Sequence, residues 1–129
     1  MPMAPMQLDY GKMETLTRWS WCDALFMAPP VYAKLYGQTL DRKYLDFMNR
    51  EYKATYDLLF DKEENLFYRD TRYIGKQEAN GKKVFWGRGN GWVLGGLAEI
   101  LKALPADEPS RKFYQELFVT LATRVAELQ

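Results

Sequence analysis

Histidine is missing from this chain of 129 residues, and cysteine occurs only once, at Cys22. Without histidine the chain cannot build imidazole-ligated metal sites or catalytic triads that use imidazole. A single cysteine forms no disulfide within the chain and says little about the compartment. Carboxylates therefore remain the natural groups for acid–base chemistry. We expect neither a metal site nor a cofactor.

An excess of charge of one sign and long apolar runs are also lacking. The 18 basic and 17 acidic residues leave a net charge of +1, which gives no footprint for nucleic acid. No apolar run approaches the length of a membrane span. The stretch from Met1 to Met6 lacks a basic segment followed by an apolar one, so we expect no signal peptide there. These patterns favour neither a nucleic acid nor a membrane as partner.

Aromatic residues are abundant, at 16% of the chain, and two of the four tryptophans frame a glycine-rich run from Trp86 to Trp92. Indole faces suit the apolar face of a sugar ring, and the guanidinium of Arg88 suits a carboxylate. We interpret the run as a strand-to-helix turn that exposes backbone N–H groups at a helix start. The spacing alone leaves two interpretations open: a ligand-binding turn, or a structural turn whose tryptophans are core.

Apolar periodicity predicts a mainly helical chain with short strands. We expect helices over residues 19–36, 41–60, 91–103 and 108–129, and strands near residues 66–74 and 83–86. Pro29 and Pro30 should kink the first helix or start a new one, Gly37 should cap its end, and Asp41 should cap the second helix. Short connections favour antiparallel helix pairs. Residues 1–16 show no clear period and are expected to be poorly ordered, which leaves 17–129 as one helical segment.

Three motifs, at residues 21–29, 66–70 and 85–92, resemble in order and separation glycoside hydrolase family 105. These are the unsaturated rhamnogalacturonyl hydrolases, related to the unsaturated glucuronyl hydrolases of family 88. The resemblance covers nearly everything from Trp19 to Gln129. It implies an all-α fold of antiparallel αα-hairpins forming part of an (α/α)6 barrel, of which this chain would supply about two hairpins. We expect exposed helix faces, self-association into a homo-oligomer, and no activity of the isolated chain.

The resemblance also implies a chemistry. The substrate would be a pectin-derived oligosaccharide that ends in an unsaturated uronic acid. One carboxylate would protonate C4 of the C4=C5 double bond and then accept a proton from the water that adds at C5. Asp23 matches this catalytic carboxylate, and its apolar neighbours favour the proton-bearing form. From the residues alone, a helix cap or a surface aspartate is the alternative.

Further positions match the family's substrate-binding residues. They are Trp21, Arg69, Trp86, Arg88, Asn90 and Trp92. Arg69 departs from the family pattern, because many members have a histidine there and a permanent charge replaces a titratable group. A second important aspartate of the family matches no residue of this chain.

Two other functions stay open on the sequence alone. One is a non-catalytic sugar-binding domain that keeps the aromatic turn. The other is a helical interaction module that associates through its apolar faces. The resemblance leaves the parent protein's location open between the bacterial cytoplasm and periplasm, and it does not identify the uronide.

Overall fold

A computed structural model describes residues 18–129, and the segment 1–16 that was expected to be poorly ordered lies outside the described residues. The helices are α1 (Ala24–Met27), α2 (Pro29–Thr39), α3 (Arg42–Leu59), α4 (Gly87–Ala103) and α5 (Arg111–Glu127). The remaining elements are the strands β1 (Phe60–Asp61) and β2 (Leu66–Phe67) and the 3₁₀ turn η2 (Thr71–Tyr73). None of the described helices is long and apolar enough to cross a membrane.

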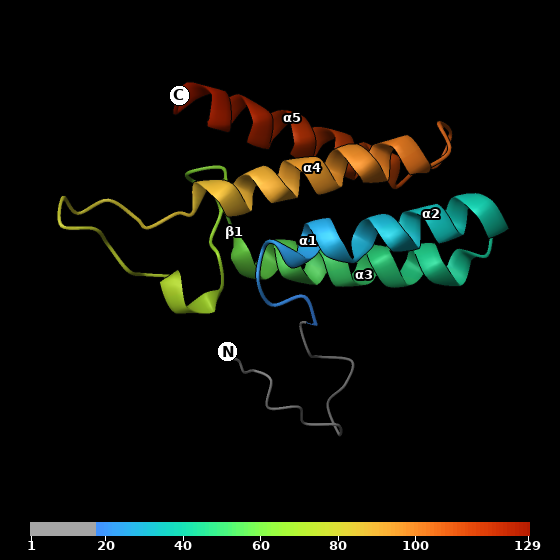
Figure 1. Cartoon of the computed structure of the whole chain (residues 1–129), viewed down its shortest axis with the longest axis horizontal. Helices are drawn as coiled ribbons and strands as arrows, with labels where there is room; N and C mark the ends of the chain where they lie inside the picture. The colour runs from blue at the N-terminus through green and yellow to red at the C-terminus, as the bar shows by residue number, and fades with distance from the viewer. Residues whose placement is uncertain (1–17) are drawn as a thin grey trace, which may run out of the picture.

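The helices form two αα-hairpins that pack side by side (Figure 1). Helix α2 packs against α3, α4 packs against α5, and the hairpins meet where α2 contacts α4. Helices α2 and α4 run in the same direction, so α1 and the start of α4 lie at the same end of the molecule (Figure 1). This confirms the predicted helical architecture and gathers the motif residues at one end.

The first hairpin shows one confirmed and one wrong local prediction. Pro29 and Pro30 take the first two positions of α2, where a missing N–H costs little, and the chain breaks at Ala28 as expected. Gly37, however, does not end the helix. A Cβ at Gly37 would lie 2.9 Å from the carbonyl oxygen of Ala103, so glycine is used there for close contact with the end of α4. The helix ends at Thr39, and Leu40 takes the left-handed conformation at φ 57°.

The strand predictions were too long. The sheet pairs Phe60 with Phe67 and Asp61 with Leu66, and it goes no further. After β2 the side chain of Asp70 accepts a hydrogen bond from the backbone N–H of Arg72 at 2.9 Å and opens η2 instead. The predicted strand at 83–86 is reduced to an isolated bridge between Gln77 and Lys83.

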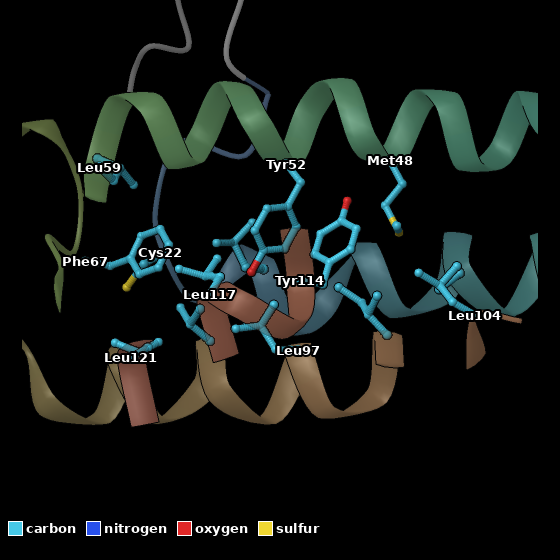
Figure 2. Packing of buried hydrophobic residues seen from close by; sticks show 14 of the residues in the cluster. Cys22, Met48, Tyr52, Leu59, Phe67, Leu97, Leu104, Tyr114, Leu117 and Leu121 are labelled. Atoms are coloured by element: carbon cyan, nitrogen blue, oxygen red, sulfur yellow. The ribbon is translucent and has the colours of Figure 1, made fainter. Parts of the chain in front are cut away.

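The core lies between the two hairpins (Figure 2). Tyr52 from α3 and Tyr114 from α5 meet edge to face at its centre, with ring centroids 5.1 Å apart. The Tyr114 hydroxyl donates to Oδ1 of Asn49 at 2.6 Å. The Tyr52 hydroxyl has no hydrogen-bond partner within residues 18–129. Of these two buried hydroxyls, only that of Tyr114 is hydrogen-bonded within residues 18–129.

Candidate active site

The glycine-rich run is the start of α4 itself, which corrects its interpretation as a turn that precedes the helix. Trp86 is the extended residue before the helix, and Gly87 is the first helical residue. A Cβ on Gly89 would lie 2.8 Å from the sulfur of Cys22 and 2.5 Å from the Trp86 ring. Gly89 therefore lets α4 pack tightly against the segment that precedes Asp23.

Helix α1 lies directly on α4 about two turns beyond Gly89. A Cβ on Gly96 would lie 2.3 Å from the carbonyl oxygen of Leu25, which no side chain could tolerate. A Cβ on Gly95 would touch the ring of Phe26 at 3.4 Å. Because α1 has only four residues, this contact and that of Gly89 fix the position of Asp23 relative to the start of α4.

Asp23 stands immediately before α1, at the position of a helix cap, but its side chain makes no capping hydrogen bond. The side chain is half-buried, and its Oδ1 atom is buried without a hydrogen-bond partner among the residues that the structure describes. Buried carboxylate oxygens are nearly always hydrogen-bonded. The expected alternative of a capping aspartate therefore lacks its defining hydrogen bond, and the carboxyl is available for a ligand.

A backbone hydrogen bond joins the segment that precedes Asp23 to the segment after β2, which carries Arg69. The N–H of Cys22 donates to the carbonyl oxygen of Arg69 at 2.8 Å, and Trp21 forms an antiparallel bridge with Asp70. Burial, and next the charge of Asp23, raise the pKa of the Cys22 thiol to about 12. Cys22 is thus a neutral packing residue, not a nucleophile.

An open hollow of about 370 Å³ lies beside this link. Its lining consists of Arg69, Tyr73, Val84, Phe85, Trp86 and Arg88. The guanidinium carbons of Arg69 and Arg88 lie 5.3 Å and 5.1 Å from the centroid of the Trp86 ring. Three of the predicted binding residues therefore meet in one place, where two cations and an indole can receive an anionic sugar.

Trp21 and Trp92 lie at the surface, with exposed fractions of 37% and 42%. The ring of Trp92 contacts Phe26 with centroids 4.8 Å apart. Met27 and Val31 of the same region are also exposed. Trp92 is therefore not a core residue, whereas Trp86 is partly buried against the core. The exposed aromatic and aliphatic side chains lie along α1, α2 and α4.

Asn90 differs from the other predicted binding residues, because its amide is used inside the protein. Its Oδ1 accepts from the N–H of Phe67 at 2.8 Å, and its Nδ2 donates to the carbonyls of Phe67 and Trp86 at 3.0 and 3.1 Å. The side chain is only 2% exposed. Asn90 clamps β2 to the start of α4, so its amide is occupied inside the protein and does not face a ligand.

No group of three or more histidine, cysteine, aspartate or glutamate side chains that could hold a metal ion occurs within residues 18–129.

The family profile described as Glycosyl Hydrolase Family 88 matches residues 6–129. An unsaturated 3S-rhamnoglycuronyl hydrolase of Formosa agariphila is 52% identical over 86% of this chain and 31% of its own length. A protein of the same name from an Alteromonas species is 46% identical over 87% of this chain and 27% of its own length. An unsaturated rhamnogalacturonyl hydrolase of Bacillus subtilis is 28% identical over 70% of this chain and 26% of its own length.

Solved structures share the fold of the described chain. A glycosyl hydrolase family 88 protein from Bacteroides vulgatus matches 93% of this chain and 36% of its own chain, with a TM-score of 0.83 and 35% identity. A protein titled as a polysaccharide lyase matches 91% of this chain and 35% of its own, with a TM-score of 0.81 and 39% identity. A family 105 glycoside hydrolase from C. acetobutylicum matches 84% of this chain and 32% of its own, with a TM-score of 0.68 and 25% identity. This chain thus spans about a third of the length of these relatives.

Proposed function

The chain belongs to Glycosyl Hydrolase Family 88, and from this membership we propose that it forms the part of a hydrolase that cleaves unsaturated uronyl residues from oligosaccharides. The reacting sugar carries a C4=C5 double bond and a carboxylate at the non-reducing end. Asp23 is the acid–base group, and the Arg69–Trp86–Arg88 hollow receives the anionic part of the substrate. The observation that carries the proposal is the buried Oδ1 of Asp23, which has no hydrogen-bond partner within residues 18–129 and lies beside the backbone link to Arg69.

The reaction that we propose needs only one carboxyl group. Protonated Asp23 gives its proton to C4, and positive charge develops at C5 and the ring oxygen. Asp23, now a carboxylate, accepts a proton from the water whose oxygen bonds to C5. The resulting hemiketal opens to a ketone, and this releases the glycosidic oxygen as the hydroxyl of the next sugar. Ordinary glycoside hydrolysis instead uses a pair of carboxylates.

The aromatic and cationic residues bind the substrate in this proposal. Arg88 pairs with the uronate carboxylate, because a guanidinium holds a carboxylate through two parallel hydrogen bonds. Trp86 stacks on the sugar, and the exposed rings of Trp21 and Trp92 cover the neighbouring sugars. Asn90 takes part only by holding Trp86 and the start of α4 in place.

The names of the relatives narrow the substrate that we propose. The two relatives with 52% and 46% identity are named for rhamnoglycuronyl substrates, and the relative with 28% identity is named for a rhamnogalacturonyl substrate. All three names combine rhamnose with a uronyl residue, so we propose an unsaturated uronyl residue linked to rhamnose as the substrate. The rhamnogalacturonan-derived substrate that the sequence motifs first implied is one member of this class.

Titration calorimetry tests the binding part of this proposal with the chain as it is. An unsaturated uronyl–rhamnose disaccharide should bind, and the same disaccharide with a neutral sugar in place of the uronate should bind at least tenfold more weakly. Arg88→Gln should remove that difference, whereas Lys82→Gln, which lowers the net charge equally at an exposed loop position, should preserve it. Equal binding of both disaccharides by the unmodified chain would contradict the proposal.

A further inference from the structure

Lys83 stands directly before residues 84–86, the segment that forms one wall of the hollow. Its Nζ atom donates hydrogen bonds to Oδ2 of Asp61 at 2.8 Å and to Oε1 of Glu63 at 2.6 Å. Asp61 ends β1, and Glu63 lies in the turn between β1 and β2. The ammonium group therefore ties the wall segment, residues 84–86, to the β1–β2 hairpin.

The carboxylate of Asp61 is a fixed partner for this ammonium group. Its Oδ1 accepts hydrogen bonds from the backbone N–H groups of Glu63 and Glu64, both at 2.9 Å. Its Oδ2 accepts from the Tyr68 hydroxyl at 2.9 Å as well as from Lys83. The Asp61 side chain is 10% exposed and that of Glu63 is 77% exposed, and solvent weakens an exposed ion pair. The pair with Asp61 is therefore the one that holds Lys83.

A ring stack forms a second link between the same two parts of the chain. Tyr68, which is buried directly after β2, stacks on Phe85 with ring centroids 4.8 Å apart and 25° between the ring planes. The Tyr68 hydroxyl and the Lys83 ammonium group share one oxygen of Asp61. These four side chains are therefore connected in one cluster, called the Lys83 anchor below: Asp61, Tyr68, Lys83 and Phe85.

The loop that precedes Lys83 explains why the wall segment needs such an anchor. Every residue from 74 to 82 is exposed. Its backbone hydrogen bonds include two local ones, from the N–H of Glu78 to the carbonyl of Lys82 and from the N–H of Gly81 to the carbonyl of Glu78. An exposed loop with local contacts opens easily and does not fix the residues that follow it. Lys83 is the first residue after this loop that is not exposed, so its ammonium group fixes the start of the wall segment.

We propose that Lys83 is a positioning residue, which acts through the Lys83 anchor to keep the Trp86 ring where the substrate binds. Asn90 holds the far end of the wall segment at the Trp86 carbonyl, and Lys83 holds the near end. The guanidinium groups of Arg69 and Arg88 lie over the Trp86 ring, so a shift of the wall segment moves the surface that both cations share. The charge of Lys83 is paired with two carboxylates, and Lys83 does not line the hollow. This inference rests on the proposed function of the hollow.

Fluorine NMR of the full chain labelled with 5-fluorotryptophan tests the anchor without any ligand. The chain has four tryptophans, so four resonances are expected, and Trp86→Phe identifies that of Trp86. Lys83→Met keeps the aliphatic stem, removes the ammonium group, and should shift or broaden the Trp86 resonance. The resonance of Trp19, which lies against Phe47 in the first hairpin, should stay in place. Lys82→Met, at the adjacent exposed position, is the matched control and should leave all four resonances unchanged.

Calorimetric binding of the unsaturated uronyl–rhamnose disaccharide measures the consequence for the hollow. We expect Lys83→Met to weaken binding about tenfold, at a temperature at which thermal melts show every variant to be folded. Lys83→Arg keeps the charge and should restore most of the affinity. The matched neutral disaccharide should lose affinity by the same factor, because the displaced Trp86 ring serves both ligands. Lys82→Met should bind both disaccharides as tightly as the unmodified chain.

The two measurements separate this inference from the proposed function. An unchanged Trp86 resonance in folded Lys83→Met overturns the inference and leaves the proposed function standing. A loss of affinity confined to the uronyl disaccharide also overturns it, because Lys83 would then act by its charge on the ligand. If the unmodified chain binds neither disaccharide, the proposed function fails, and the fluorine spectra still decide whether Lys83 holds Trp86. Should Lys83→Met not fold, Lys83→Gln gives the same comparison, because its amide removes the charge and keeps a donor for Asp61.

Discussion

The backbone N–H of Cys22 donates a hydrogen bond to the carbonyl oxygen of Arg69 at 2.8 Å, across 47 positions of the sequence. This contact joins the segment that carries Asp23 to the segment after β2, whose residues Arg69 and Tyr73 line the hollow. It follows that changes in the packing around Cys22 should affect both the proposed acid–base group and the proposed binding residues.

Gly96→Ala should destabilise the protein strongly. A Cβ at this position would lie 2.3 Å from the carbonyl oxygen of Leu25, so α1 must move away from α4. We expect a loss of at least about 2 kcal/mol of unfolding free energy, measured by urea denaturation. Gly91→Ala is the matched control in the same helix, because nothing lies within 4 Å of a Cβ there. It should stabilise the protein by about 0.5–1 kcal/mol, and equal effects of the two variants would contradict the close contact between α1 and α4.

Asn90→Ala should also be costly, because it leaves the buried N–H and C=O of Phe67 without their side-chain partner. Each unsatisfied buried group costs about 1–3 kcal/mol, so we expect a loss of about 3 kcal/mol in a thermal or urea melt. Asn80→Ala removes an amide that accepts one hydrogen bond in an exposed turn. Its effect should stay within about 0.5 kcal/mol, and similar losses in the two variants would contradict the clamp.

Tyr52→Phe should leave the unfolding free energy unchanged or raise it by up to about 1 kcal/mol, since it removes a buried hydroxyl without a partner among residues 18–129. Tyr114→Phe removes a hydroxyl that is hydrogen-bonded to Asn49 and should cost about 1 kcal/mol. Urea denaturation of the two variants decides the comparison. If Tyr52→Phe is the more harmful change, the Tyr52 hydroxyl has a partner that the described residues do not contain.

The lowered pKa of Asp61 predicts that the free energy of unfolding falls in acid. Burial raises the pKa of its carboxyl, but hydrogen bonds from Lys83, the backbone of Glu64 and the hydroxyl of Tyr68 outweigh burial and lower the pKa from 3.8 to about 2. A depressed folded-state pKa stabilises the folded protein above the unfolded value, and this contribution is lost as the pH falls from about 4 to about 2. We expect Asp61 to contribute about 2 kcal/mol of the acid-induced loss. In the same pH series, Asp61→Asn should lose about 2 kcal/mol less unfolding free energy between about pH 4 and about pH 2 than the unmodified protein. An unchanged pH dependence would contradict the role of Asp61 in the acid-induced loss.

The sequence predicted the features that depend on local chemistry. Asp41 caps α3 by accepting from the N–H of Lys43 at 3.0 Å, as expected for an aspartate before a helical run. Pro29 and Pro30 interrupt the first predicted helix at the expected place because proline acts through its own backbone. The meeting of Arg69, Trp86 and Arg88 followed from the motifs, because the family resemblance carries long-range information that periodicity lacks.

The features that the sequence missed depend on distant contacts. Gly37 and Gly89 serve close packing against Ala103 and Cys22, which are far away in the sequence, so local rules read them as a cap and a turn. Asn90 looked like a ligand-binding amide, and its partner Phe67 lies 23 positions away. A polar residue on the apolar side of a helix start was the one signal that could have suggested a structural clamp.

The central claim is that Asp23 drives hydration of the C4=C5 bond, and turnover of an unsaturated uronyl–rhamnose disaccharide tests it most directly. The assay uses a protein with a complete helical barrel that includes this chain, run in D₂O, and follows the ultraviolet absorbance of the double bond together with rhamnose release. Loss of absorbance should match rhamnose release one for one, with one deuteron at C4 of the product. Asp23→Asn should slow both by about 10²- to 10⁴-fold while binding is retained. Rhamnose release with the double bond intact, or an Asp23→Asn rate within a few-fold of the unmodified protein, would contradict the claim.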